Sequence, residues 1–114
     1  MATTASRFGR LMLAVGTIGV TFLLGLPARA QETGESLFKG KCAMCHGPDA
    51  SGKTVMGEKL KVPDLHSEQV QKKSESELRG IISKGKDKMP AYENKLSKEQ
   101  IDKLVAYLRE LAKH

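Results

Sequence analysis

Cys42-Ala43-Met44-Cys45-His46 is the most informative stretch of this 114-residue chain. It has the pattern C-x-x-C-H, which is the attachment sequence of a covalently bound c-type haem. Cysteines three positions apart lie about one helical turn apart on the same side of the chain. Their thiols can therefore reach the two vinyl groups of one porphyrin and form thioethers. The histidine that follows is carried under the iron as its proximal ligand, so the motif predicts one haem c and one axial ligand.

Two other kinds of site also use a C-x-x-C pair. A structural zinc site needs four ligands, commonly including a second pair of cysteines or histidines. Cys42 and Cys45 are the only cysteines, and the remaining histidines, His66 and His114, do not form such a pair. A redox disulfide of the thioredoxin kind is expected beside a βαβ pattern, and the sequence shows no alternation typical of strands. Zinc or thiol chemistry without haem is the alternative to haem attachment.

Residues 1–30 differ in composition from the rest of the chain. A short basic start precedes the almost wholly apolar run 11–26, and a small-x-small tripeptide follows at 28–30. This order is typical of a secretory signal peptide, and we expect cleavage after Ala30. Because the apolar run is long for a leader, an uncleaved membrane anchor is the alternative. The expected organisation is a signal peptide followed by one mature domain, residues 31–114.

The composition of the mature chain limits its partners and its core. Loss of the three arginines of the leader leaves 16 basic and 13 acidic residues, a formal charge of +3. No long basic run interleaved with aromatic residues indicates a nucleic-acid partner. Leu, Ile, Val and Phe make up 16 of the 84 residues, a share close to that of disordered chains. A porphyrin would add a large apolar body to this thin core, so we expect folding to depend on it.

The mature sequence predicts helices separated by loops. Thr33 can cap a first helix, and Ser74 with Glu77 and Ser97 with Gln100 have the spacing of capping boxes. Apolar residues recur at helical spacing after each box. We expect four helices: one from 33 through the haem motif to Gly47-Pro48, a short one at 67–73, one from 74 to Gly85 and one from 97 to 111. Between them we expect a loop over 47–62, an extended or turn segment at 63–65 and a loop over 86–94.

The last of these helices has an apolar stripe that needs a partner. The first helix, near Gly34 and Phe38, is the natural one, because a glycine lets two helix backbones approach closely.

Four separate stretches of the chain carry a family resemblance. They are Gly34-x-x-x-Phe38, the motif Cys42 to His46, Lys88-Met89-Pro90-Ala91-Tyr92 and Leu104-Val105-Ala106-Tyr107-Leu108. Together, over about residues 33–112, they resemble the class I cytochromes c, specifically the small soluble single-haem bacterial and algal kind. The resemblance implies an all-α fold of three to five helices around one covalently attached haem, with the N- and C-terminal helices packed together.

Met89 is the predicted sixth ligand of the iron. Its thioether is a soft, neutral ligand that favours ferrous iron and raises the reduction potential, and Pro90 restricts the backbone just after it. The alternative is that Met89 fills the core, as methionine often does. Met44, Met56 and His66 are the other candidates, and His66 would give a bis-histidine site of lower potential.

On the proximal side, His46 is expected to bind iron through Nε2 and to donate its other ring N–H to a backbone carbonyl. The resemblance implies that this carbonyl belongs to Pro63 and that Leu65 packs against the porphyrin. The role of Tyr92 stays open between a position near a propionate and one at the surface.

Two protein ligands would leave the iron without an open position, and the remaining chemistry is the gain and loss of one electron. The sequence thus predicts a periplasmic electron carrier that shuttles between larger redox complexes and is not an enzyme. The alternative is a labile sixth ligand, which would give peroxidase activity or small-ligand sensing.

Four lysines bracket Met89, at positions 84, 86, 88 and 95. A solvated charged loop explains them adequately. The functional alternative is a positive rim that steers an acidic redox partner, such as a reductase, an oxidase or a dehydrogenase. We expect a monomer without nucleic-acid partners, and contact with a membrane only if the apolar run is retained.

Overall fold

The computed structural model describes residues 32–114 together with Gly16, Gly19 and Gly25. The predicted signal peptide lies outside the described residues, apart from these three glycines. In the described part no helix is long and apolar enough to cross a membrane.

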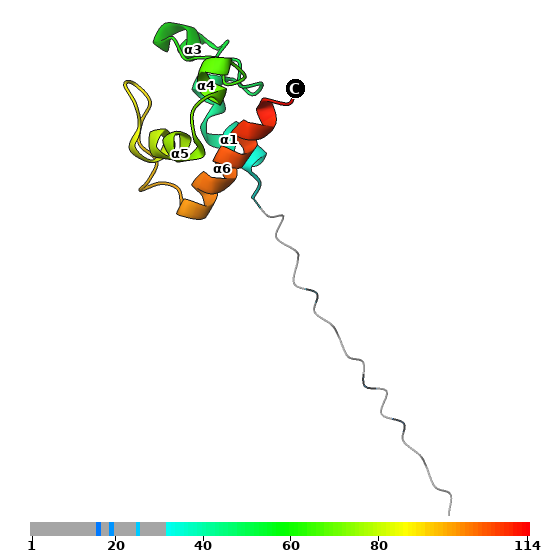
Figure 1. Ribbon diagram of the computed structural model, residues 1–114. Coiled ribbons are helices and arrows are strands. Elements are labelled where there is room, and N and C mark those ends of the chain that lie inside the picture. Colours follow the sequence, from blue (N-terminus) through cyan, green and yellow to red (C-terminus); the bar gives the residue numbers. More distant parts are fainter. Residues whose placement is uncertain (1–15, 17–18, 20–24, 26–31) are drawn as a thin grey trace, which may run out of the picture.

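Every named element in the described part of the chain is a helix, and none is a strand (Figure 1). Its helices, in chain order, are α1 (Gly34–Lys41), α2 (Ala43–His46), α3 (Val55–Leu60), α4 (Glu68–Gln71), α5 (Glu75–Lys84) and α6 (Lys98–Leu111). One isolated bridge pairs Lys86 with Met89 in the loop after α5. The all-α prediction is confirmed, although the short helices α2 and α4 bring the number above the expected five.

The predicted helix starts are confirmed. Thr33, Ser74 and Ser97 are the N-caps of α1, α5 and α6, and each takes part in a reciprocal capping box. In such a box the cap side chain accepts from a backbone N–H of the first turn, while a side chain of that turn accepts from the N–H of the cap. α5 ends at Gly85, as predicted, where a φ of +76° suits glycine.

The prediction of a loop over residues 47–62 is wrong, because α3 lies within it. Thr54 caps this helix by accepting from the N–H of Gly57, and its hydroxyl donates to the carbonyl of Cys45 at 2.8 Å. A Cβ at Gly57 would come within 2.1 Å of the Gly52 carbonyl oxygen, so only glycine fits there. Residues 47–62 are rich in Gly, Ser and Lys, which predicted a loop. α3 depends on the contacts of Thr54 and Gly57 rather than on an apolar stripe.

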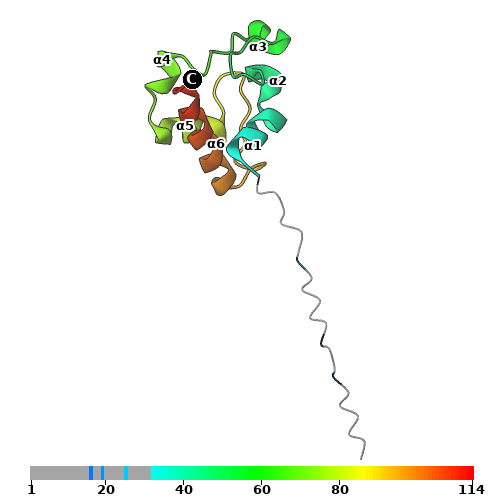
Figure 2. The ribbon, with the colours of Figure 1, turned by 90° about the vertical axis from the view of Figure 1, so that its right-hand side faces the viewer.

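α1 and α6 cross side by side in both views (Figures 1 and 2). Gly34 permits the close approach, since a Cβ there would lie 2.2 Å from the carbonyl oxygen of Lys103. Phe38 of α1 stacks at a tilt on Tyr107 of α6, with 5.3 Å between ring centroids. The predicted pairing of the first and last helices is therefore confirmed.

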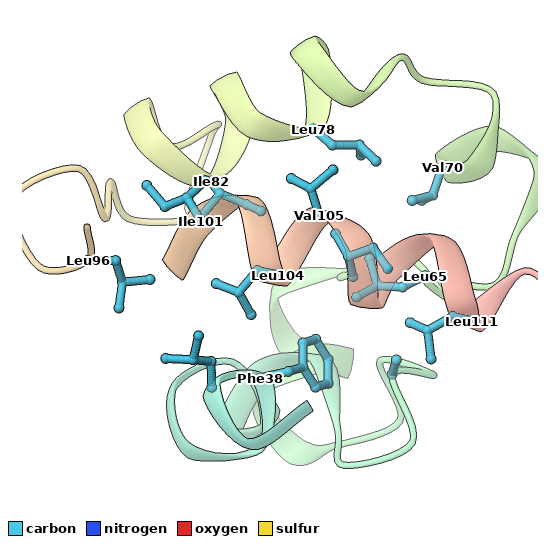
Figure 3. Packing of buried hydrophobic residues seen from close by; sticks show 13 residues of the cluster. Phe38, Leu65, Val70, Leu78, Ile82, Leu96, Ile101, Leu104, Val105 and Leu111 are labelled. Carbon is cyan, nitrogen blue, oxygen red and sulfur yellow. The ribbon is translucent and has the colours of Figure 1, made fainter. Parts of the chain in front are cut away.

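The core lies where α5, α6 and α1 meet. Figure 3 shows Leu78 and Ile82 of α5 directed towards α6, and Phe38 on α1 directed towards Leu104. The buried apolar residues are Leu37, Phe38, Ala50, Leu65, Val70, Leu78, Ile82, Leu96, Ile101, Leu104, Val105, Leu108 and Leu111. This short list agrees with the thin core expected from the composition.

A hydrogen-bonded strut joins α4 to α6 and to the segment before α4. The side-chain amide of Gln71 donates to the carbonyls of Leu65 at 2.8 Å and Leu108 at 2.9 Å. Arg109 donates to the backbone carbonyl of Gln71 at 2.9 Å and to that of Lys73. The strut fixes the path of residues 63–73 along the domain.

Candidate functional site

A cavity of about 450 Å³ lies between the α1–α2 junction, the segment 60–65, α5, the loop after α5 and α6. Its walls are mostly apolar and include Phe38, Leu78, Ile82, Leu104 and Leu108. All six residues predicted for the site line this one cavity: Cys42, Cys45, His46, Pro63, Leu65 and Met89. The fold thus gathers residues that are far apart in the sequence.

Cys42 immediately precedes α2, and Cys45 lies within it. The Cys45 N–H lies 3.3 Å from the Cys42 carbonyl oxygen. Both are half-buried free thiols. Burial raises the pKa of the Cys42 thiol to about 11, so it stays protonated at neutral pH. Because the thiolate is the form that binds zinc and exchanges disulfides, burial works against both reactions at the Cys42 thiol.

The structure also lacks the ligand set that a zinc site requires. Among residues 32–114 and the three described glycines, no group of three or more His, Cys, Asp or Glu side chains is placed to hold a metal ion.

His46, at the end of α2, has a buried ring nitrogen without a hydrogen bond. Its Nδ1 has no partner among the described residues, and leaving such a group unpaired costs about 1–3 kcal/mol. Burial lowers the pKa of His46, so the ring is neutral at pH 7 and a lone pair is available. A neutral, half-buried imidazole that lines a cavity is well suited to bind a metal held there.

The hydrogen bond predicted between His46 Nδ1 and the Pro63 carbonyl is not formed in this structure. Pro63 nevertheless lines the same cavity as His46. The segment is held at Leu65, whose N–H donates to the Ala50 carbonyl at 2.9 Å and whose carbonyl accepts from Gln71 at 2.8 Å. Leu65 is buried and lines the cavity, and its packing against a porphyrin stays a prediction.

Met89 lies in a tightly turned loop. Its N–H and carbonyl pair with the carbonyl and N–H of Lys86, at 2.9 and 3.2 Å. Gly85 makes this possible, since a Cβ there would lie 2.5 Å from the Met89 carbonyl oxygen. The Met89 side chain is half-buried, packs against the core and lines the cavity. The loop therefore holds one thioether at the cavity.

None of the rival ligands lines the cavity. Met44 is 79% exposed, and Met56 lies on the surface of α3. His66 is held elsewhere, with its Nδ1 2.7 Å from a carboxylate oxygen of Asp64.

Several residues of the cavity were not predicted from the sequence. Lys61, Lys73 and Gln69 line it beside the apolar residues, and Tyr92 does so three positions after Met89. Only for Tyr92 could the sequence have predicted a place at the cavity, because Tyr92 belongs to the Met89 loop motif. The others come to the cavity through α3 and the strut, which the sequence pattern did not reveal.

Comparison with known proteins accounts for this arrangement. The family described as cytochrome C oxidase, cbb3-type, subunit III matches residues 29–108. The chain belongs to the cytochrome c family. Haem c, bound covalently, is the cofactor of this family, and the thiol pair, the neutral imidazole with its unpaired nitrogen, the thioether and the apolar walls fit such a group.

Individual cytochromes c resemble the chain over most of its length. Cytochrome c6 of a Synechococcus species is 34% identical, with 85% of this chain and 86% of the relative covered. Cytochrome c6 of Thermosynechococcus vestitus is 33% identical, with 88% and 90% covered.

Among solved structures, the KustC0563 c-type cytochrome superposes with a TM-score of 0.65 at 28% identity. The superposition covers 70% of this chain and 98% of that one. The expected class I cytochrome c fold is thereby confirmed.

Proposed function

We propose that this cytochrome c is an exported one-electron carrier in which His46 and Met89 are the two axial ligands. The observation that carries the proposal is the single cavity lined by both thiols, one buried neutral imidazole and one thioether. When bound, haem c supplies an iron that takes up and releases one electron reversibly.

Each group of the protein then has a separate task. Cys42 and Cys45 would hold the porphyrin by thioethers, and His46 would supply a lone pair to the iron. Met89 would supply a neutral sulfur that favours the ferrous state. If both side chains bind the iron, no position would be left for a substrate, and the protein would carry electrons without catalysing a reaction of its own.

Optical spectra of the holoprotein in both oxidation states test the axial ligands. We expect the far-red sulfur-to-iron band in the ferric wild type and its loss in Met89→Ala. Met44→Ala is the matched control, because Met44 is exposed and lies outside the cavity. Survival of the band in Met89→Ala, or rapid carbon monoxide binding by the reduced wild type at neutral pH, would favour the labile site instead.

The proposed location is the periplasm, after cleavage behind Ala30. The mass of the exported protein checks this directly. It should equal that of residues 31–114 plus one haem, whereas a retained leader would add residues 1–30.

The charged residues at the cavity suggest the kind of partner. Of the four lysines expected around Met89, Lys86 and Lys88 line the cavity, whereas Lys84 and Lys95 do not. The lining also includes Lys61 and Lys73, against a single acidic residue, Asp87. This lysine rim would attract a redox protein with an acidic docking surface. Electron transfer with the native partner should slow as ionic strength rises, because salt screens exposed charges.

Charge reversal tests the lysine rim. The double variant Lys86→Glu, Lys88→Glu should reduce the bimolecular rate about tenfold at low salt. Lys113→Glu, at the C-terminal end, is the control and should change it little. A rate that does not depend on salt would exclude the steering role.

A further inference from the structure

Tyr92 connects the Met89 loop with the segment that carries the cysteines. Its hydroxyl donates to the carbonyl of Lys41, the last residue of α1, at 3.4 Å. Within residues 32–114, this is the one hydrogen bond between the loop 85–96 and the segment 34–46. The contact spans the cavity wall from one ligand-bearing segment to the other.

The acceptor of this bond has no other protein donor in the described part of the chain. The last carbonyls of a helix lack intrahelical donors, and the Lys41 carbonyl lies in an exposed position. The next residue is Cys42. The Tyr92 phenol is therefore the one protein donor to the carbonyl immediately beside the first attachment point.

The rest of Tyr92 is held by shorter hydrogen bonds and by packing. Its backbone N–H lies 3.0 Å from the Ile82 carbonyl and 3.2 Å from that of Ser83, at the end of α5. Its carbonyl accepts from Leu96 at 2.8 Å. Its ring packs against the core, lines the cavity and lies under the Lys95 ammonium, 5.5 Å from the ring centroid. Tyr92 is thus the point at which the loop is tied to both α5 and α1.

We propose that Tyr92 is a positioning residue for the sixth ligand. Its phenol clamps the loop 85–96 onto the end of α1 and so limits how readily the Met89 sulfur leaves the iron. The inference deepens the proposed function and rests on Met89 as the axial ligand. In this proposal Tyr92 neither takes part in electron transfer nor contacts the redox partner. It acts through the loop that carries Met89.

Imidazole binding to the ferric holoprotein measures this directly, because imidazole binds only when the sulfur has left. Tyr92→Phe should keep the far-red band but bind imidazole about two- to fivefold more tightly. This factor is at the low end for the loss of one neutral hydrogen bond, as suits a 3.4 Å contact. Tyr92→Leu, which also lacks the ring, should give a larger increase.

Tyr107→Phe is the matched control. Tyr107 is the other tyrosine of the chain, and its ring packs between α1 and α6 on Phe38, away from the Met89 loop. This variant should leave imidazole affinity unchanged even where it lowers the thermal stability. Equal imidazole affinity in wild type and Tyr92→Phe, or an equal rise in both tyrosine variants, would overturn the proposal for Tyr92 alone. Absence of the far-red band from the wild type would overturn the axial role of Met89 as well.

Discussion

Gly34 on α1 lies against the backbone of Lys103 on α6, so closely that a Cβ at residue 34 would stand 2.2 Å from the Lys103 carbonyl oxygen and 2.9 Å from its carbonyl carbon. These Lys103 atoms belong to the helix backbone, so they cannot move aside by a side-chain rotation. The distance between the two helices is therefore set by the absence of a side chain at this one position.

Substitution of Gly34 should push the helices apart. We expect Gly34→Ala to lower the free energy of unfolding of the holoprotein by about 2 kcal/mol, through overpacking. Gly40→Ala, in the same helix, is the control: a Cβ there meets nothing within 4 Å, and the variant should gain about 0.5–1 kcal/mol from helix propensity. Denaturant unfolding distinguishes the two, and equal effects would contradict this account of Gly34.

The strut at Gln71 offers a second test. Gln71→Leu would leave the carbonyls of Leu65 and Leu108 without their donor, at about 1–3 kcal/mol for each buried group left unpaired. Lys72→Ala, the adjacent surface position, should change stability by less than about 0.5 kcal/mol. Thermal unfolding of the holoproteins gives the comparison. A change in Gln71→Leu no larger than in Lys72→Ala would show that water replaces the amide.

Ionisation of Asp64 should make the free energy of unfolding depend on pH in the acidic range. The backbone N–H of His66, at 2.9 Å, and then its ring hold the pKa of the Asp64 carboxyl below its usual range. The pKa of Asp64 is lower in the folded than in the unfolded protein. Its ionised carboxylate therefore stabilises the fold fully at pH values above the unfolded pKa of about 3.9, and this contribution is lost as the pH falls through the folded pKa. The group is largely exposed, so we expect less than about 1 kcal/mol.

Asp64→Asn should therefore flatten the dependence of stability on pH between about 5 and 3, while Glu93→Gln, on the exposed loop, should not. Urea unfolding at a series of pH values measures the slope. An unchanged slope in Asp64→Asn would show that the His66 contacts do not persist in solution.

The cavity predicts the behaviour of the chain without its cofactor. Without the porphyrin, the mostly apolar walls of this partly open cavity would face water, and so thin a core has little stability to lose. The double variant Cys42→Ala, Cys45→Ala should therefore lose most of its far-UV circular dichroism at 222 nm. Full native helicity in that variant would mean that the helices pack without the porphyrin.

Local chemistry made much of this molecule predictable from its sequence. Ser74 and Ser97 predicted the starts of their helices because a capping box is complete within four residues. The cysteine motif likewise contains, within five residues, all that its geometry requires. α3 was missed because its cap, Thr54, is fixed by the Cys45 carbonyl, nine positions earlier in the chain. The hydrogen bond between His46 and Pro63 was expected by resemblance and is not formed here. What the sequence did not reveal depends on contacts that reach beyond a single helical turn.

The pairing of α1 with α6 has a consequence for biosynthesis. α1 is the first helix of the described part and α6 is the last, so Leu37 and Phe38 meet their partners only after α6 has been synthesised. Such non-local closure delays folding. Until α6 docks on α1, the segment that carries Cys42 and Cys45 lacks its final packing, so both thiols stay accessible for covalent attachment of the porphyrin.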